Sequence, residues 1–460
     1  MIRFFWGQFS EFDTATEEGR HRERYRRAGL TAVSNMFSRA IALAVIFVSM
    51  RVALPFLGEA RFGVWATISS LTAVLMIFDF GIGNSMVTRV AGLAAQSEWL
   101  ALRRLIISGL SILSAIGLLL GAMLVALAAY APLSWLYKGA APALLDEARS
   151  TLMLFGVLFG ISIPLQAIHR IYAGLQEGYV SSCATCFMGI LSLLALPLIP
   201  RFQAGIPTLL LITYGLQIGS GLLLLVALHR RFDLTLPTLA DFRGSIVRDF
   251  AVNGSLFFVL QMTGVIGWDM DALLLSALIG PASAAIYAVV QRMFMLVTGP
   301  LAVMNAPLWS SYADANARGD FGYIRKTLLR SLLLTFVFAA LGVTILVMLR
   351  TPIAHLLTKG VLDPPWTLVL IFGVWTVIAA TSDSLAMYLN GLHILKPQII
   401  AAACFLTAAL ILKLMLVARY GLYGVIPATL LSYLSTVGVL YLTVFRRAIF
   451  APLRASMSDT

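Results

Sequence analysis

Seven charged side chains stand inside long apolar runs of this sequence: Arg39, Asp79, Asp269, Asp271, Arg292, Asp383 and Lys413. A charge at the centre of a lipid bilayer costs about 2.5–3.5 kcal/mol on insertion scales, so each one needs a partner or a function. Arginine presents a fork of N–H donors that fits an oxyanion, whereas a buried carboxylate holds a counter-charge or carries a proton. The residue types therefore predict recognition of charged groups at membrane depth.

Four of these charges fall into two predicted pairs. The pairs are Arg39 with Asp79, on either side of a turn near Gly58, and Asp271 with Arg292, on either side of a turn near Gly280. The members of each pair are almost equally far from their turn, which predicts a similar depth in the membrane. Two interpretations stay open. Each pair is a structural ion pair, or its arginine lines a cavity and holds an anionic substrate while the aspartate supplies counter-charge or ion coupling.

Helical phase separates the two aspartates of the seventh apolar run. At ~100° per residue, Asn253, Gly264, Gly267 and Asp271 fall on one face, whereas Asp269 lies well round from it. Glycines on that face permit a break or a close helix contact. We therefore expect Asp271, with Asn253, to face the cavity.

Further polar and aromatic residues are candidates for the same cavity. Asp383 follows Thr381 and Ser382, and its counterpart in the other half of the chain is Gln166. A polar patch on paired helices predicts either a coupling-ion or sugar site or plain interhelical hydrogen bonding. Four aromatic residues could stack on sugar rings, namely Trp309, Tyr287, Trp65 and Trp375, although aromatic residues of membrane helices mostly pack or anchor. For Lys413 we expect snorkelling toward a membrane face.

The elements that must position these residues are membrane-spanning helices. The 460 residues are 60% hydrophobic and only 12% charged, whereas a soluble protein spends about 25% of its residues on charges. Apolar runs of about 20 residues, enough to cross the hydrocarbon core, recur along the whole chain. They predict about twelve spans, at residues 28–54, 63–88, 104–131, 149–173, 180–199, 206–229, 249–279, 284–311, 327–349, 366–390, 398–418 and 424–445.

The two halves of the chain resemble each other. Residues 57–66 align without a gap on residues 279–288, and Leu102-Arg103-Arg104 falls on Ile324-Arg325-Lys326. A repeat of six spans begins and ends on the same side, so the halves are parallel. The predicted fold is thus an all-α integral membrane protein with two six-helix lobes around a central cavity, an arrangement that favours transport over catalysis.

Lys and Arg residues gather in the short loops on one side, which the positive-inside rule places in the cytoplasm together with both termini. The predicted organisation is a cytoplasmic segment at 1–27, either an interfacial helix or a loose tail, a lobe at 28–229, a linker at 230–248, a lobe at 249–445 and a tail at 446–460. The short loops hold no nucleotide-binding loop, zinc-protease motif or nucleophile elbow, so no enzyme is expected. The net charge of +12 is spread over these loops, which argues against a nucleic-acid partner.

Three short motifs carry a resemblance to a known family. They are Leu57-Gly58 with Phe62-Gly63-Val64-Trp65, Asp79-Phe80-Gly81-Ile82-Gly83-Asn84, and Gly174-Leu175-Gln176-Glu177-Gly178-Tyr179. The chain resembles the polysaccharide-transport (O-antigen flippase) branch of the multidrug/oligosaccharidyl-lipid/polysaccharide exporter superfamily over nearly its whole length. That resemblance implies a flippase of the bacterial inner membrane that moves undecaprenyl-diphosphate-linked glycans outward by alternating access. It also implies diphosphate binding by Arg39 and Arg292, on the helices where related flippases carry cavity arginines.

Other functions fit parts of the pattern. A multidrug exporter of the same superfamily would favour the acidic residues Asp79, Asp271 and Asp383 for a cationic substrate. A membrane glycan polymerase or ligase should present catalytic residues on a large periplasmic loop, and the longest loop, around 132–148, carries few charges. A scaffold of a glycan-assembly complex would leave the buried charges and the repeat unexplained. No cofactor is expected, and H+ or Na+ coupling stays open.

Overall fold

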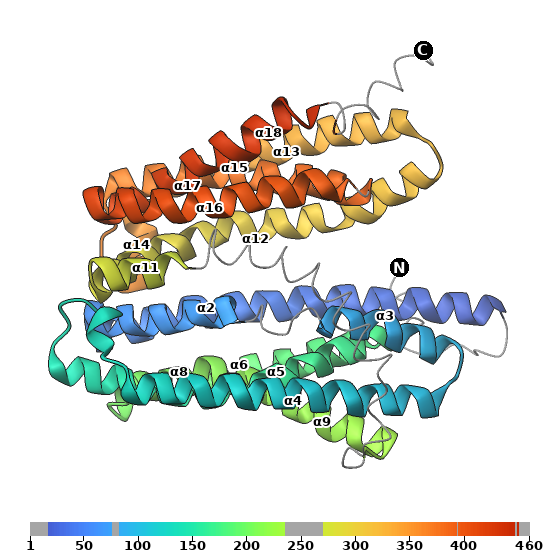
Figure 1. Cartoon of the computed structure of the whole chain (residues 1–460), viewed down its shortest axis with the longest axis horizontal. Coiled ribbons are helices and arrows are strands. Elements are labelled where there is room, and N and C mark those ends of the chain that lie inside the picture. The colour runs from blue at the N-terminus through green and yellow to red at the C-terminus, as the bar shows by residue number, and fades with distance from the viewer. Residues whose placement is uncertain (1–16, 76–81, 235–269, 393, 447–448, 450–460) are drawn as a thin grey trace. The chain divides into compact units, whose positions relative to one another are not determined.

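The computed structural model of the chain describes residues 17–75, 82–234, 270–392, 394–446 and 449 (Figure 1). These residues form helices joined by short turns, and none of them lies in a strand. The predicted all-helical fold is confirmed.

Nine helical segments within the described ranges are long and apolar enough to span a membrane. They are Gly29–Thr72, Trp99–Tyr130, Pro142–Gly174, Gly178–Arg201, Ile206–Phe232, Pro281–Asn316, Phe321–Met348, Trp366–Gly391 and Lys396–Leu442. The first segment reaches into two of the predicted spans and the last contains most of two others. Most of the predicted seventh span lies outside the described residues. The chain is therefore a multi-pass membrane protein.

The chain divides into two units, and in each of them the long helices run side by side (Figure 1). Unit 1 comprises Met1–Phe56, Leu75–Leu133 and Pro142–Phe258. Its helices are the first part of α2 (Glu17–Leu75), α3 (Ile82–Ala95), α4 (Trp99–Tyr130), α5 (Pro142–Gly174), α6 (Gly178–Ala195), α7 (Leu198–Arg201), α8 (Ile206–Leu210), the π-helical turn Leu211–Gly215 and α9 (Leu216–Phe232).

Unit 2 comprises Leu57–Val74, Ser134–Ala141 and Val259–Thr460. It contains the second part of α2 and α11 (Asp271–Leu278), α12 (Pro281–Ala317), α13 (Phe321–Met348), α14 (Arg350–Thr358), α15 (Trp366–Gly391), α16 (Leu395–Tyr420), α17 (Val425–Tyr433), the π-helical turn Leu434–Gly438 and α18 (Val439–Leu442). Among the described residues, the last apolar segment of each unit thus contains a π-helical turn. The lobe boundaries expected from the sequence stay a prediction.

Helix α2 changes direction at the predicted break. Gly58 adopts φ 76° and ψ 171°, a non-helical conformation that interrupts the helix just after Pro55. Gly280, its counterpart in the aligned repeat, also has a positive φ, of 138°. Residues with a Cβ rarely adopt such values, so glycine permits both turns.

Helices α4 and α5 approach each other through glycines. A Cβ added to Gly117 would lie 2.2 Å from the carbonyl oxygen of Gly160, and one added to Gly121 would lie 2.9 Å from that of Gly156. In a membrane the hydrophobic effect does not drive helices together, so association depends on close packing through small residues of this kind. The glycines therefore let the two backbones pack closely.

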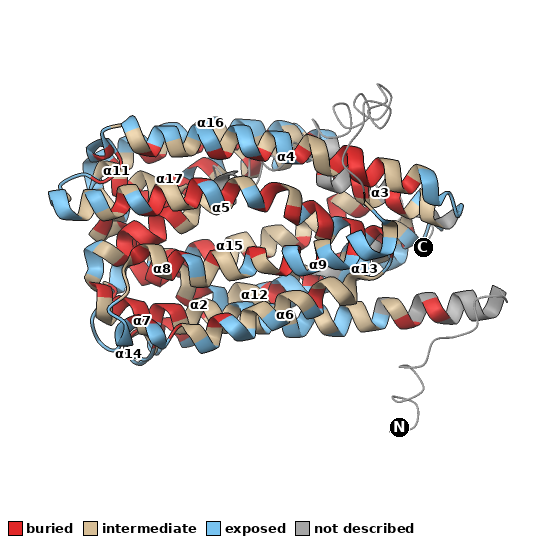
Figure 2. Cartoon of the chain, turned by 90° about the horizontal axis from the view of Figure 1, so that it is seen from below, coloured by how far each residue is buried: buried red, intermediate tan, exposed pale blue. Residues whose placement is uncertain are grey.

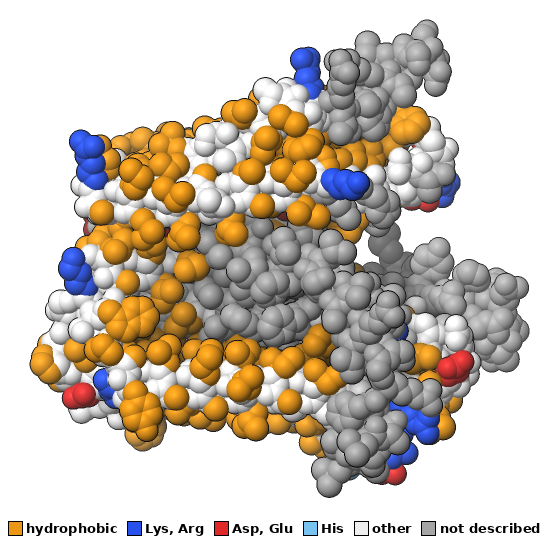
Figure 3. Space-filling model, viewed as in Figure 1, with side chains coloured by type: hydrophobic (Ala, Val, Ile, Leu, Met, Phe, Trp, Pro, Cys, Tyr) orange, Lys and Arg blue, Asp and Glu red, His pale blue; other side chains and the backbone are white. Residues whose placement is uncertain are grey.

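Large apolar side chains are exposed along the helices. On α4, Leu118, Leu119 and Met123 are 75%, 70% and 56% exposed, and Figure 2 shows buried and exposed residues alternating along the same helices. On the face drawn in Figure 3, hydrophobic side chains cover the lengths of the helices, and Lys and Arg lie toward their ends. Such a surface suits lipid chains between two polar interfaces.

The glycine contact between α4 and α5 makes a prediction about stability. We expect Gly117→Ala to lower the melting temperature in detergent, because the new methyl group overlaps the Gly160 carbonyl and overpacking typically costs ~1–3 kcal/mol. Gly92→Ala in α3 is the matched control, since no atom lies within 4 Å of its added Cβ. Differential scanning fluorimetry of both variants checks this. Equal melting temperatures would contradict the packing argument.

Candidate functional site

Arg292 lies on two aromatic rings of unit 2. Its Cζ atom is 4.4 Å from the centroid of the Trp65 ring and 5.5 Å from that of Phe62. The two rings are themselves 5.1 Å apart between centroids. A guanidinium over an aromatic face is attracted by the negative charge of the ring face. Arg292 is thus held by cation–π contacts from the second part of α2.

The arginine is held but keeps an unused donor. Its Nη1 atom is buried and has no hydrogen-bond partner among the described residues, and the same holds for Nε1 of Trp65. Buried donors are normally satisfied, so two neighbouring exceptions call for an explanation. An acceptor-rich anionic ligand would supply acceptors that the described residues do not.

Gly63 brings the aromatic rings to the arginine. A Cβ added to Gly63 would lie only 1.7 Å from the carbonyl oxygen of Pro281, the first residue of α12. The backbone of α2 therefore packs directly on the start of the helix that carries Arg292. Phe62 and Trp65 are three residues apart, so their side chains lie on the same face of the helix. The contact of Gly63 with Pro281 brings both side chains close to α12.

Asp271 pairs with Lys413, which was predicted to extend toward a membrane face. Its carboxylate is 2.5 Å from Nζ of Lys413 on α16 and accepts a hydrogen bond of 2.6 Å from the Tyr287 hydroxyl on α12. Asp271 and Lys413 are each only 2% exposed. The prediction of snorkelling for Lys413 is wrong, and the expected pairing of Asp271 with Arg292 is not found. The physical reason is that a buried carboxylate needs a counter-charge, and α16 supplies one.

Asp383 belongs to a second polar group of unit 2. Its Oδ2 atom accepts a hydrogen bond of 3.1 Å from Nδ2 of Asn305, and the Asn305 side chain accepts one of 3.3 Å from the Thr335 hydroxyl. These contacts join α15, α12 and α13. Asn305 was not among the predicted site residues, although an amide within an apolar run was the available signal.

The remaining candidates lie on separate helices or outside the described residues. Arg39 is exposed on α2 and makes no ion pair with a described carboxylate, while its expected partner Asp79 lies outside the described residues. Asn253 lies outside them too. Gln166 is exposed on α5, and Trp309 on α12 is 50% exposed. The roles predicted for these residues stay predictions.

Next to Gln166, His169 joins three helices of unit 1. Its Nδ1 atom is 2.6 Å from the Ser181 hydroxyl on α6, and its Nε2 atom is 3.2 Å from the Ser220 hydroxyl on α9. Both ring nitrogens are thus used in hydrogen bonds between helices. In the parts of the chain that the structure describes, no group of three or more His, Cys, Asp or Glu residues could hold a metal ion.

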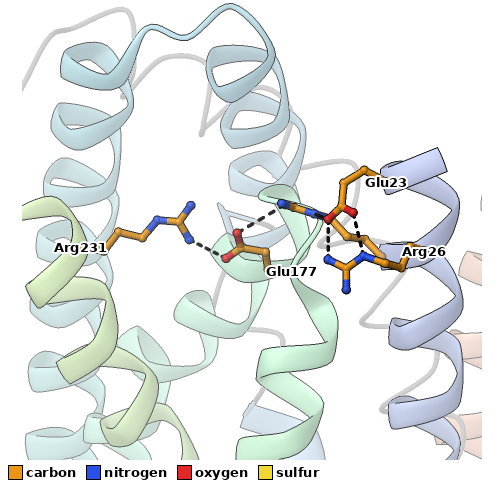
Figure 4. Close-up of polar contacts among 5 residues, drawn as sticks. Glu23, Arg26, Glu177 and Arg231 are labelled. Carbon is orange, nitrogen blue, oxygen red and sulfur yellow. Dashed lines mark hydrogen bonds and ion pairs between the residues drawn. The ribbon is translucent and has the colours of Figure 1, made fainter. Parts of the chain in front are cut away.

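A network of charges ties the start of α2 to unit 1 (Figure 4). Glu23 pairs with Arg26 through two hydrogen bonds of 2.7 and 2.6 Å, and it also accepts one of 2.8 Å from Arg27. Glu177, between α5 and α6, pairs with Arg27 at 3.5 Å and with Arg231 at the end of α9 at 2.6 Å. The motif residue Glu177 therefore holds two other segments of its unit.

The Asp271–Lys413 pair makes a prediction about stability. We expect Lys413→Met to lower the melting temperature strongly, because removing one partner of a buried ion pair costs about 3–5 kcal/mol. Adding Asp271→Asn should recover most of that loss, since no uncompensated charge then remains. Differential scanning fluorimetry of the single and double variants measures the coupling. Lys396→Met, at an exposed lysine, is the control, and a Lys413 variant as stable as this control would refute the pairing.

Comparisons with known proteins agree with this architecture. No family model matches the chain. A protein of Yersinia pseudotuberculosis named for O-antigen export is 21% identical over 411 residues, which cover 89% of this chain and 93% of that protein. The comparisons indicate a transporter rather than an enzyme.

Solved structures with the same fold belong to transporters. A multidrug resistance MATE family transporter of the MOP superfamily, in an inward-facing conformation, matches with a TM-score of 0.76 and 14% identity over 92% of this chain and 99% of its own. The lipid II flippase MurJ, in an inward closed conformation, matches with a TM-score of 0.70 and 16% identity over 93% of this chain and 90% of its own. The chain therefore has the fold of the multidrug/oligosaccharidyl-lipid/polysaccharide (MOP) exporter superfamily, and the predicted resemblance to its polysaccharide-transport branch is confirmed.

Proposed function

We propose that this protein is a flippase for an undecaprenyl-diphosphate-linked oligosaccharide, such as an O-antigen or exopolysaccharide repeat unit. It moves this substrate from the cytoplasmic to the periplasmic leaflet of the bacterial inner membrane by alternating access between two lobes, 28–229 and 249–445, with both termini in the cytoplasm. The observation that carries the proposal is Arg292, a cation inside an apolar helix that is held by Phe62 and Trp65 and keeps a buried donor without a partner in the described structure.

The chemistry of arginine fits a diphosphate. A guanidinium donates parallel N–H bonds to two oxygens at once, and it stays charged at any working pH. A diphosphate spreads its charge over several oxygens, so a second arginine adds contacts that the first cannot make. We assign that second role to Arg39, which makes no ion pair with a described carboxylate.

Movement of an anion outward is favoured by the membrane potential. An interior-negative potential contributes about 2.3 kcal/mol per charge per 100 mV, provided that the charge crosses uncompensated. An ion-coupled step is therefore an addition to this driving force rather than a requirement. If one operates, we place it at Asp79 or at Asp383, whose carboxylate contacts the neutral amide of Asn305. Asp271 already has the ammonium of Lys413 as its counter-charge.

The relatives support the substrate class. One is named for O-antigen export, and a solved structure of the same fold is named a lipid II flippase. A sugar chain on the lipid needs room and stacking surfaces, for which Gln166, Asn253 and the exposed Trp309 are candidates. Enzymes that assemble the glycan on the inner leaflet or consume it on the outer leaflet are the partners we expect.

Export of cationic drugs is the alternative that the same fold permits. It needs carboxylates free to meet a cation, and in unit 2 Asp271 is neutralised by Lys413 at 2.5 Å. Arg292, which makes no ion pair with a described carboxylate, would repel a cationic substrate. The charges at Asp271, Lys413 and Arg292 therefore favour an anionic head group, whereas Asp383, which contacts the neutral amide of Asn305, is the carboxylate of unit 2 that drug export would use.

The proposed function predicts a transport defect in two variants. We expect Arg292→Ala and Arg39→Ala each to reduce translocation of an undecaprenyl-diphosphate oligosaccharide in proteoliposomes by tenfold or more, because a charge-assisted contact contributes about 1.5–3 kcal/mol. Translocation is measured as the glycan that becomes accessible to an impermeant enzyme on the other side of the membrane. Arg318→Ala, at an arginine whose side chain is 74% exposed, is the control and should transport normally.

Two results would refute this function. Normal transport by both arginine variants would remove the diphosphate-binding role. Absence of glycan transport in correctly inserted wild-type protein, together with efflux of a cationic dye in a parallel assay, would establish the drug-export alternative instead.

A further inference from the structure

The observed contacts of Arg292 are with aromatic ring faces rather than with hydrogen-bond acceptors. The rings of Trp65 and Phe62 lie 4.4 Å and 5.5 Å from its Cζ atom, and such contacts act on the charge through the ring quadrupole. A ring face is not a conventional oxygen or nitrogen acceptor, so the guanidinium keeps its capacity to donate hydrogen bonds to an oxyanion. Consistent with this, Nη1 of Arg292 has no hydrogen-bond partner among the described residues.

The obvious competitor for those donors is engaged elsewhere. Asp271 is held by Lys413 at 2.5 Å and by the Tyr287 hydroxyl at 2.6 Å. Tyr287 precedes Arg292 by five residues on α12, so the neutralised carboxylate is fixed to the same helix as the arginine. Had Asp271 paired with Arg292, as its position along the chain suggested, the donor edge would be occupied.

We propose that Phe62 and Trp65 are positioning residues that hold Arg292 ready for an anionic group without occupying its donors. This inference rests on the proposed function, because it takes the anion to be the diphosphate of the lipid carrier. The rings form an aromatic support, defined here as Phe62 and Trp65. The support stabilises the positive charge in an apolar setting and fixes the orientation of the guanidinium plane.

Preorganisation explains why such a support strengthens binding. A long, flexible side chain loses conformational freedom when it binds a ligand, and that loss weakens the affinity. Holding the guanidinium beforehand moves this loss from the binding step to the folding of the protein. A carboxylate partner would also order the side chain, but the ligand would then have to displace it.

The fold keeps the support rigid. Phe62 is 0% and Trp65 is 3% exposed, and Gly63 between them packs its backbone against that of Pro281 at the start of α12. The segment that carries the support therefore packs directly on the helix that carries the arginine. In the motif Phe62-Gly63-Val64-Trp65, Phe62 thus supports Arg292 and Gly63 allows the close contact with α12. Neither role was predicted from the sequence.

The experiment compares binding of two lipids that differ only at the head. Undecaprenyl diphosphate and the neutral alcohol undecaprenol are titrated against purified full-length protein, and native mass spectrometry gives the ratio of their affinities. The variants are Trp65→Leu, Trp65→Phe, Phe62→Leu and Arg292→Ala. Trp375→Leu is the matched control, since Trp375 is also a buried tryptophan of unit 2 but packs on Tyr433.

We expect Trp65→Leu to lower the preference for the diphosphate roughly three- to thirtyfold, the range that cation–π contacts span between exposed and desolvated sites. Phe62→Leu should lower it less, because its ring lies farther from Cζ of Arg292. Trp65→Phe keeps an aromatic face and should retain most of the preference. Binding of undecaprenol should stay unchanged in all of these variants, which a merely structural defect would not produce.

The outcomes separate this inference from the proposed function. If Arg292→Ala loses the diphosphate preference while Trp65→Leu and Phe62→Leu keep it, the aromatic support is refuted and the function stands. If wild type shows no preference, or Arg292→Ala retains it, the diphosphate role of Arg292 fails first. If Trp65→Leu does not fold, Phe62→Leu and Trp65→Phe decide the question, and a Trp65→Phe variant with no preference refutes the support. A Trp375→Leu variant with the same loss as Trp65→Leu also refutes it.

Discussion

Neutralising charge at membrane depth is the constraint on which the functional part of this structure depends. Water is absent there, so every ionised side chain must find its stabilisation inside the protein. Unit 2 solves the problem in two ways. Lys413 and Asp271 form an ion pair in which each charge compensates the other, whereas Arg292 rests on aromatic rings that stabilise its charge without cancelling it. The first arrangement holds helices together, and the second leaves a net positive charge available.

These two arrangements leave different charges behind. A lysine on α16 is the counter-charge of the carboxylate at the start of α11, whereas the arginine on α12 makes no ion pair with a described carboxylate. The partner of the carboxylate is therefore a residue remote in sequence from the arginine. A fold shared by transporters of different substrates can in this way change its preference through few residues, because the scaffold of helices stays the same.

The membrane-spanning helices could be predicted from the sequence, but the pairing of charged side chains between them could not. Apolar run length follows directly from bilayer thickness, so the spans could be predicted. Glycines between the runs marked the breaks at Gly58 and Gly280. The resemblance to a transporter family could also be recognised from the sequence, because the short motifs that carry it lie at the ends of helices. Pairing of charges could not be predicted. The distance of a residue from a turn predicts its depth in the membrane but not the direction in which its side chain points. Asp271 pairs with Lys413, which belongs to a helix far along the chain.

Glu177 carries a consequence for the synthesis of the protein. One of its oxygens meets Arg27 near the start of the chain, and the other meets Arg231 at the end of α9. A growing chain exposes these residues in order, so the carboxylate can bind the first arginine long before the second leaves the ribosome. The bridge closes only when α9 has been made. Glu177 thus joins the first part of α2 to α9 before most of unit 2 exists.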